Sequence, residues 1–357
     1  MFAKLFQRDR YAVGCLAIAS LLLYLWRLGQ LPLRDWDEAT VAMVAREMLQ
    51  TGSWLHPTLY GEPYLNKPPL VEWLMASTFA VGGVNEWTAR LVPALITAAA
   101  VPLLYWLGRE LFENRKAALW SALVYLNLLP VARHGRLAMR DGVAITLFLL
   151  LSVAVLKARH RQRWAVVAGL AFGGMMLAKG ILAVLLAGII FIFLLADGQW
   201  KLLRSGYAWA GLALGCLPAI AWYAAQFQHY GADFWQAHFL SQSLDRVWSV
   251  VERNQGPPWY YVSEILKYGW PWLLFWPGGM RLAWQNRDRA WGKWIWIGTV
   301  IYLGTISVMG TKLPWYVMPL YPFMALTMGS QIATLSDRKN DIRWLGALLF
   351  YLTIVLV

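Results

Sequence analysis

An acidic cluster directly follows the first long apolar segment of the chain. Asp35, Asp37 and Glu38 lie between an apolar segment at 11–29 and an amphipathic helix predicted at 38–50. A carboxylate at the end of an apolar segment can act as a general base that takes a proton from an attacking hydroxyl group. Asp37 is also placed to be the N-cap of the predicted helix. We therefore expect Asp37 to be either a base or a cap, with Asp35 or Glu38 next in line as the base.

Two lysines occur where apolar surroundings make a charge costly. Lys67 precedes two prolines and is the only lysine or arginine between Arg46 and Arg90, and Lys179 lies in the turn of an apolar hairpin. A lysine in such a place can extend its long side chain to the lipid headgroups, or it can bind a phosphate group. Both interpretations remain open for both residues.

The composition defines the setting in which these residues act. Of the 357 residues, 59% are hydrophobic and only 14% are charged, whereas soluble domains average about 45–50% and about 25%. Cys15 and Cys216 both lie inside apolar runs, which excludes a disulfide framework or a cysteine metal site. An ordinary soluble enzyme, a disordered protein and a disulfide-stapled secreted domain are therefore excluded.

Apolar segments long enough to span a bilayer recur along the whole chain. A helix needs roughly 17–25 residues to cross the hydrocarbon layer, and we predict about eleven such spans, several of them short. The segment 69–84 carries Glu72 and is expected not to cross. The predicted spans are 11–29, 90–108, 117–133, 142–156, 164–178, 181–196, 206–225, 259–279, 294–310, 314–333 and 343–357.

The net charge of +13 follows from this topology. With 69–84 not crossing, one side receives nineteen basic and seven acidic residues, a net charge of +12, and the other side is left with +1. Basic residues concentrate in cytoplasmic loops, so the N-terminus is expected in the cytoplasm. Because the topology explains the excess of basic residues, no nucleic acid is expected as a partner.

Two long loops lie on the extracytoplasmic side. They cover 30–89 and 226–258, and each is expected to contain interfacial helices. All the cytoplasmic loops are short, so chemistry carried on loops is expected outside. The chain is expected to form one transmembrane domain over 1–357. Because Val357 lies inside an apolar run, we expect a longer natural product that continues into a C-terminal periplasmic domain.

Motifs in a fixed order give these features a family resemblance. They comprise an acidic pair, an amphipathic helix, a turn with a proline, a proline-rich helix entry and a lysine–proline–tyrosine string. They are Asp37-Glu38, Arg46-Glu47-Met48-Leu49, Gly52-Ser53-Trp54-Leu55-His56-Pro57, Lys67-Pro68-Pro69 and Lys312-Leu313-Pro314-Trp315-Tyr316. The order resembles the membrane glycosyltransferases of the GT-C class. Within that class it resembles the protein O-mannosyltransferase family and its bacterial relatives, which include the lipid A aminoarabinose transferase.

The resemblance implies a fold, an activity and a location. The fold is an all-α polytopic membrane protein of the GT-C type. The activity is transfer of a sugar from a polyprenyl-phosphate donor to a hydroxyl or phosphate acceptor, which is lipid A, another envelope glycolipid or a protein. The location is the bacterial inner membrane, with the active site on the extracytoplasmic face. No cofactor is required.

The resemblance also assigns roles to the acids. The first-loop acid of the family is its catalytic base, which corresponds to Asp37, with Glu38 beside it. Asp141, in the sequence AMRDG, corresponds to a second-loop acid near the active site of the family. The alternative for Asp141 is a helix N-cap paired with Arg136 or Arg140.

The cations are expected to surround the donor phosphate. The resemblance assigns this role to Lys179 and Lys312, and it places Tyr316 in the pocket. We add Lys67, and we add Arg246 as a reserve, because charge builds up on the departing phosphate and positioned cations stabilise it.

A metal site is a further expectation. His238 resembles a family histidine that, with a first-loop glutamate, binds a divalent metal in the aminoarabinose transferase. The residue before Lys67 is Asn66 and not glutamate, and asparagine is a poor ligand for a transition metal. A divalent metal held by His238 with Asp37 or Glu38 is therefore the weaker alternative, and Asn66 and His238 are expected to line the pocket.

The expected mechanism is a one-step displacement that inverts the sugar carbon. A retaining scheme needs two carboxylates about 5 Å apart, which Asp35 and Asp37 do not readily provide. The rival class is a lipid or lipid-linked sugar flippase without transferase activity. A flippase needs ionisable residues at mid-span depth, whereas the charges of this chain lie at the span ends.

Overall fold

The structure, a computed structural model, describes residues 8–35, 37–250 and 254–338. Its apolar segments form helices because, in a bilayer, backbone polar groups must be satisfied within the segment itself. The helices are α2 (Asp9–Leu25), α3 (Glu38–Thr51), α4 (Leu70–Gly82), α5 (Glu86–Ala98), α6 (Ala100–Leu111), α7 (Arg115–Asn127), α8 (Leu129–His134), α9 (Arg140–Ala158), α10 (Trp164–Lys179), α11 (Ile181–Ala196), α12 (Gly206–Tyr230), α13 (Ala232–Phe234), α14 (Asp245–Trp248), α15 (Tyr260–Tyr268), α16 (Trp276–Gln285), α17 (Ala290–Val308) and α18 (Tyr321–Arg338).

Short elements complete the described part of the chain. A two-stranded antiparallel hairpin pairs β1 (Thr58–Leu59) with β2 (Glu62–Pro63). Three segments are 3-10 helices and one is a π-helix. They are η1 (Trp200–Arg204), η3 (Trp272–Phe275), η4 (Pro314–Leu320) and the π-helical η2 (Trp235–Leu244).

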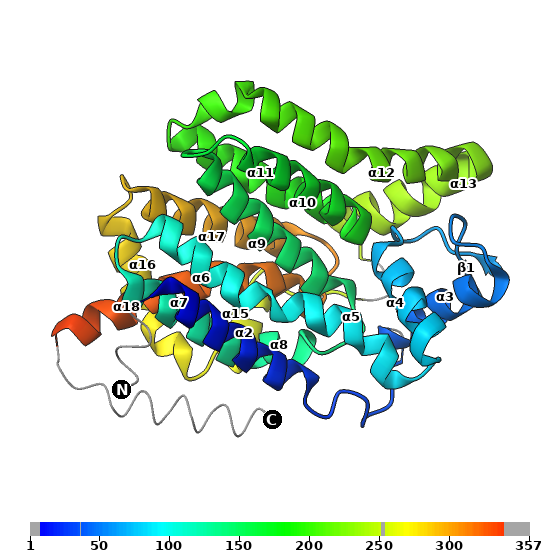
Figure 1. The fold of residues 1–357 in the computed structure, drawn as a ribbon, viewed down its shortest axis with the longest axis horizontal. Helices are drawn as coiled ribbons and strands as arrows, with labels where there is room; N and C mark the ends of the chain where they lie inside the picture. Colours follow the sequence, from blue (N-terminus) through cyan, green and yellow to red (C-terminus); the bar gives the residue numbers. More distant parts are fainter. Residues whose placement is uncertain (1–7, 36, 251–253, 339–357) are drawn as a thin grey trace.

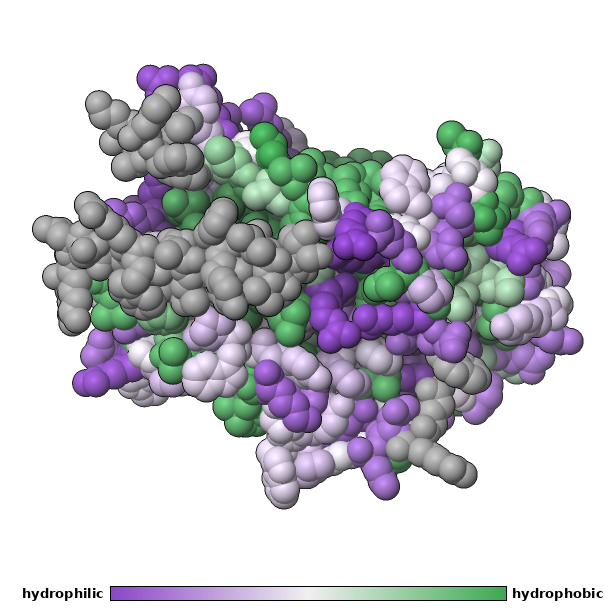
Figure 2. All heavy atoms as spheres, turned by 90° about the horizontal axis from the view of Figure 1, so that it is seen from below, coloured by the Kyte–Doolittle hydropathy of each residue, from purple (hydrophilic) through white to green (hydrophobic). Residues whose placement is uncertain are grey.

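Helices of the bundle run side by side along its length, and α3, α4 and β1 gather at one end (Figure 1). The face seen in Figure 2 carries widespread hydrophobic residues, with hydrophilic residues in groups. Large apolar side chains are also exposed along α12, among them Trp209, Leu217 and Ile220. Such exposure is unusual in a soluble monomer and fits a helix that faces lipid.

Fewer described helices are long and apolar enough to cross a membrane than the sequence predicts. Within the described residues, three segments are long and apolar enough to cross a membrane, namely Glu86–Leu111, Arg140–Ala158 and Gly206–Tyr230. The count of about eleven is therefore not confirmed. The predicted span 259–279 is not one helix, because α15 ends at Tyr268 and a turn with η3 precedes α16. The predicted span 343–357 lies outside the described residues.

The first long loop folds as its sequence predicts. The helix expected at 38–50 is α3, and it ends at Gly52, whose φ of 72° suits a residue without a Cβ atom. Its buried face, which includes Val44 and Met48, packs in one apolar cluster with Met75 of α4. With 13 residues, α4 is only about 20 Å long, which is too short to cross the hydrocarbon layer.

Two glycine pairs bring α10 and α12 into backbone contact. A Cβ atom added to Gly169 would overlap Gly211, and one added to Gly173 would overlap Gly215. Small residues spaced four apart allow such close helix packing in membranes. The position of α12 therefore depends on these four residues having no side chain.

Candidate active site

Two cavities adjoin each other beside the first long loop. The larger encloses about 750 Å³, and its wall combines charged and polar residues from both long loops and from the ends of α3, α9 and α10 with apolar residues such as Leu59, Met139 and Trp315. The smaller encloses about 330 Å³, and its wall is mainly apolar, from α11, α17 and η4. Residues common to both walls are Lys67, Asp141, Lys179, Gln242, Arg246, Trp315 and Tyr316. A polar chamber and an apolar chamber therefore meet at a charged boundary.

Asp37 lines the polar chamber. It occupies the N-cap position of α3, but its side chain makes no cap hydrogen bond, so the capping alternative is not realised. Burial raises the pKa of Asp37, and the nearby carboxylate of Asp141 raises it further, against the opposing effect of Arg34. A carboxylate with a raised pKa is a stronger base than an exposed aspartate. Asp35 lines the same chamber.

Asp141 forms an ion pair with Lys179 across the charged boundary. Asp141 lies in the first turn of α9 and is 5% exposed, whereas Lys179 ends α10. The predicted pairing of Asp141 with Arg136 or Arg140 is wrong, because Arg136 donates to the carbonyl of Trp26 and Arg140 pairs with a different acid.

Lys67 lines both cavities and has no hydrogen bond or ion pair within the described ranges. Burial lowers its pKa to about 7, and the neighbouring Arg246, Arg140 and Lys179 lower it further. A lysine held among other cations in a partly dry wall favours an incoming anion, because the anion offsets the mutual repulsion of those cations.

Arg140, Tyr64 and Arg246 complete the charged wall. Arg140 pairs with the buried Glu72 and donates a hydrogen bond of 3.2 Å to the Tyr64 hydroxyl. Arg246 donates a hydrogen bond of 3.3 Å to the hydroxyl of Tyr316. Four lining residues of the larger cavity were not predicted, namely Arg140, Tyr64, Gln242 and Asn254. The only sequence signal for Arg140 was its charge next to that of Asp141 at the start of a predicted helix.

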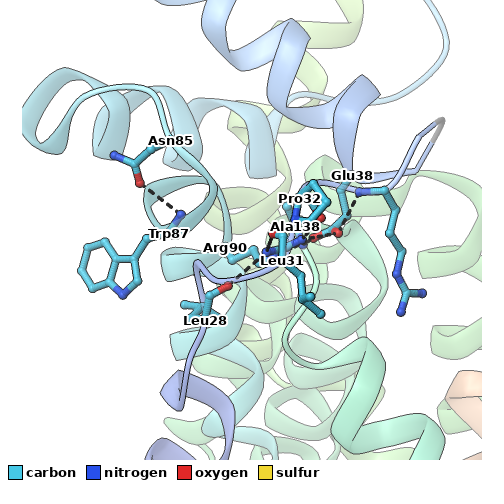
Figure 3. Close-up of polar contacts among 9 residues, drawn as sticks. Leu28, Leu31, Pro32, Glu38, Asn85, Trp87, Arg90 and Ala138 are labelled. Atoms are coloured by element: carbon cyan, nitrogen blue, oxygen red, sulfur yellow. Dashed lines mark hydrogen bonds and ion pairs between the residues drawn. The ribbon is translucent and has the colours of Figure 1, made fainter.

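Glu38 lies outside both cavities, in a buried ion pair (Figure 3). Its Oε1 atom is 2.7 Å from Nε of Arg90, and its Oε2 atom accepts from Nη2 at 2.8 Å. The backbone N–H groups of Ala138 and Arg34 also donate to Glu38, at 2.8 and 3.2 Å. Both carboxylate oxygens therefore accept hydrogen bonds within this ion pair, and the predicted catalytic role of Glu38 stays a prediction.

Arg90 connects this ion pair to the backbone before α3. Its two terminal nitrogens donate to the carbonyls of Leu28, Leu31 and Pro32 at 2.7–3.0 Å. The helix that carries Arg90, α5, begins at a cap in which Asn85 accepts from the N–H of Trp87 at 3.0 Å (Figure 3). We call Glu38, Arg90 and their backbone partners the arginine hub.

Lys312 does not line either cavity. Its ammonium group donates to the carbonyls of Ile306 and Ser307 at 2.9 and 2.6 Å, and it lies 5.5 Å from the centre of the Tyr261 ring. These carbonyls belong to the last turn of α17, where a cation satisfies acceptors that have no partner in the helix. Lys312 therefore makes a helix-capping contact in this structure, and its predicted contact with the donor phosphate stays a prediction.

His238 lies in η2 and is 4% exposed. Its Nδ1 atom is 3.0 Å from the carbonyl oxygen of Leu65, and its Nε2 atom is 3.2 Å from the Tyr223 hydroxyl. Burial lowers its pKa to about 4. Within residues 8–35, 37–250 and 254–338, no group of three His, Cys, Asp or Glu side chains could hold a metal ion. The structure therefore does not gather His238 with Asp37 or Glu38 into a metal site, whereas Asn66 does line the polar chamber.

Comparisons with known proteins show what this chain and its fold are similar to. The family described as dolichyl-phosphate-mannose-protein mannosyltransferase matches residues 66–223. Among solved structures, ArnT from Cupriavidus metallidurans bound to undecaprenyl phosphate has a TM-score of 0.81 at 22% identity, over 91% of this chain and 61% of that one. The oligosaccharyltransferase AglB from Archaeoglobus fulgidus has a TM-score of 0.56 at 14% identity, over 98% and 55%. The predicted GT-C resemblance is confirmed.

Sequence relatives narrow the resemblance further. The chain is 32% identical to undecaprenyl phosphate-alpha-4-amino-4-deoxy-L-arabinose arabinosyl transferase 1 of Pseudomonas fluorescens, over 92% of the chain and 60% of the relative. It is 30% identical to the transferase of the same name from Pseudomonas aeruginosa strain LESB58, over 94% and 62%. Its sequence is thus similar to the aminoarabinose transferases, and it spans about 60% of their length.

Proposed function

We propose that this protein is a membrane glycosyltransferase. It moves a sugar from a polyprenyl-phosphate donor to a hydroxyl or phosphate acceptor on the extracytoplasmic face of a bacterial inner membrane, with its N-terminus in the cytoplasm. The names of its relatives favour undecaprenyl phosphate as the lipid carrier, an aminoarabinose-like sugar and an envelope glycolipid such as lipid A as the acceptor.

The observation that carries this proposal is the meeting of the two chambers. A lipid-linked sugar has an apolar tail, an anionic phosphate and a polar sugar in that order. The apolar chamber, the charged boundary and the polar chamber follow one another in the same order. The tail is therefore assigned to the wall formed by α11 and α17, the phosphate to Lys67, Lys179 and Arg246, and the sugar to the chamber lined by Asp37 and Asn66.

The proposed reaction is a single displacement at the anomeric carbon. Asp37 takes the proton of the acceptor hydroxyl as its oxygen attacks, which contributes about 10²–10⁴-fold. The bond from the anomeric carbon to the phosphate oxygen breaks at the same time, and the cations stabilise the charge that remains on the lipid phosphate. Asp141 holds Lys179 in place through their ion pair. The sugar carbon is inverted, and no residue forms a covalent intermediate.

The test is turnover of a labelled donor by the purified full chain. Incubation with a radiolabelled undecaprenyl-phosphate sugar and lipid A is expected to consume the donor and label the acceptor, and Asp37→Asn is expected to abolish the transfer. The flippase alternative predicts movement of the intact donor across vesicle membranes without consumption. The proposal would be contradicted if the folded protein left the donor intact with each of the acceptors offered, namely lipid A, glycolipids and protein. A covalent glycosyl-enzyme intermediate trapped on the protein would contradict the inverting mechanism.

A further inference from the structure

An apolar groove lies at the opposite end of α9, α10 and α11 from the two cavities. It encloses about 170 Å³, and it exists because small residues line it where four helices converge. These are Ala158, Ala165, Ala168, Gly169, Ala187 and Ala208. The remaining lining side chains are all larger apolar ones, so the groove offers almost no hydrogen-bonding partner.

The groove is separate from the proposed active site. In α9, Asp141 lies at the first turn, whereas the groove begins ten residues later at Leu151 and ends at Ala158. At 1.5 Å per residue this separation is about 15–25 Å. The phosphate and the sugar of a donor bound at the charged boundary therefore cannot lie in the groove.

Exposed cations are the sequence neighbours of residues that line the groove. In η1, Leu202 and Leu203 line the groove, whereas Lys201 and Arg204 are exposed, and the guanidinium of Arg204 lies 4.9 Å from the centre of the Trp200 ring. Among the described residues, neither Lys201 nor Arg204 forms an ion pair.

The rest of the rim has the same character. Arg161 and Arg163, in the turn before α10, are exposed and have no ion pair in the part of the chain that the structure describes. The nearby acid Asp197 is already engaged, 3.0 Å from Arg159 and 3.4 Å from Lys293. The rim therefore carries excess positive charge next to an apolar groove.

We propose that the groove and its rim bind an anionic glycerophospholipid from the leaflet at that end of the bundle. One acyl chain occupies the groove, and the phosphate lies between Lys201 and Arg204. An extended peptide does not fit, because its backbone would find no hydrogen-bonding partner in the groove, and a helix is too wide for a groove of about 170 Å³. A zwitterionic lipid would fill the groove equally well but would gain little from the rim, since each lysine or arginine near an anionic headgroup contributes attraction.

The test is lipid selectivity of the full chain, measured by native mass spectrometry after exchange into micelles that contain equal amounts of phosphatidylglycerol and phosphatidylcholine. The wild type is expected to retain phosphatidylglycerol preferentially. Replacing two rim charges in the double variant K201Q/R204Q is expected to weaken that retention about 25-fold, at about fivefold for each charge.

A matched control separates this site from general surface charge. In R281Q/R287Q two exposed cations, one in α16 and one in the turn after it, are removed, and Arg287 lies over Trp284 as Arg204 lies over Trp200. The control is expected to retain the lipid as the wild type does. A third variant, Ala168→Trp, fills the groove and is expected to reduce retention of both lipids.

The proposal would be overturned by equal retention of the two lipids by the wild type, or by equal losses in K201Q/R204Q and R281Q/R287Q. Donor turnover at the distant cavities, measured in the same samples, shows that each variant is folded. Loss of lipid selectivity with turnover retained is the result expected for K201Q/R204Q.

Discussion

Asp37 and Glu38 are neighbours in the chain but lie in contrasting surroundings. Glu38 is fully buried in the arginine hub, where two N–H groups of the Arg90 guanidinium and two backbone N–H groups hold its pKa below the usual range despite its burial. Asp37 faces the polar chamber without a cap hydrogen bond, and burial together with Asp141 raises its pKa. The Glu38 carboxylate is therefore fully hydrogen-bonded within the fold, whereas the Asp37 carboxylate is free to contact a molecule in the chamber.

The contrast shows how a reactive group is held in place by an unreactive one. The arginine hub connects the segment before α3, the start of α3, helix α5 and the turn at Ala138 that leads into α9. Asp37 begins α3 and Asp141 begins α9. The relative placement of these two acids across the chamber therefore depends on a buried ion pair whose hydrogen bonds involve neither the Asp37 nor the Asp141 carboxylate.

The largest effect is expected from Asp37→Asn, which removes the proposed base and retains the shape of the side chain. Transfer is expected to fall about 10²–10⁴-fold, while the thermal midpoint stays unchanged or rises, because a partly buried charge without a hydrogen bond is lost. Turnover of labelled donor and thermal unfolding in detergent measure the two quantities. Unchanged turnover would move the base to Asp35, the other acid of the first loop that lines the chamber.

The second effect is on stability and concerns the arginine hub. Arg90→Ala leaves Glu38 as an unpaired buried charge, which is expected to destabilise the fold by about 3–5 kcal/mol. Thermal unfolding in detergent checks this. The matched control is Arg46→Ala, which removes an exposed cation of α3 and is expected to change the stability by less than about 0.5 kcal/mol. Equal shifts in the two variants would contradict the structural role of the hub.

The third prediction concerns pH and uses Lys67. Its pKa of about 7 means that the donor-free protein loses this charge as the pH rises through 7, whereas the phosphodiester of the donor keeps its charge. Donor affinity is therefore expected to fall above pH 7, by at most about tenfold per pH unit. Binding titrations between pH 6 and 9 measure this fall.

Two variants at the same position sharpen the pH test. Lys67→Arg retains the charge throughout this range and is expected to remove the fall in affinity, while Lys67→Met is expected to bind weakly at every pH. The same slope in all three proteins would assign the titration to another group.

The smallest effect on the reaction is expected from Lys312→Met. Its ammonium contacts carbonyls of α17 and not the cavity, so we expect a stability loss of about 1–3 kcal/mol with the KM for the donor unchanged. Lys179→Met, at the charged boundary, is expected to raise that KM. A comparable rise in the Lys312 variant would restore the phosphate contact that the sequence motif predicts.

Local patterns predicted the elements near the site well. The apolar spacing of 38–50 and the glycine at position 52 predicted α3 and its end, because both signals can be read from the local sequence of the helix. The charged residues Asp37, Asp141, Lys67, Lys179 and Arg246 could likewise be selected as candidates, since a charge beside an apolar span is costly. The structure brings these five to the walls of one pair of cavities.

Contacts between distant residues could not be predicted in this way. Glu38 and Arg90 are 52 residues apart, and nothing in either local sequence indicates that they pair. Lys312 lies in a distinctive motif, but whether its ammonium reaches the cavity or the end of α17 depends on the direction of the chain after Val308. The span predicted at 259–279 is apolar enough to cross, yet it contains a turn that hydropathy does not reveal.

The glycine contact between α10 and α12 has a consequence outside the helix pair. Near its far end α12 carries Trp222 and Gln226, which donate to the carbonyl of Leu55 in the first long loop, and Tyr223, whose hydroxyl meets His238 in the second. A single methyl group added at Gly215 would push α12 outward and pull both loops with it. The absence of a side chain at a buried contact between two helices therefore sets how closely two loops at their far end approach each other.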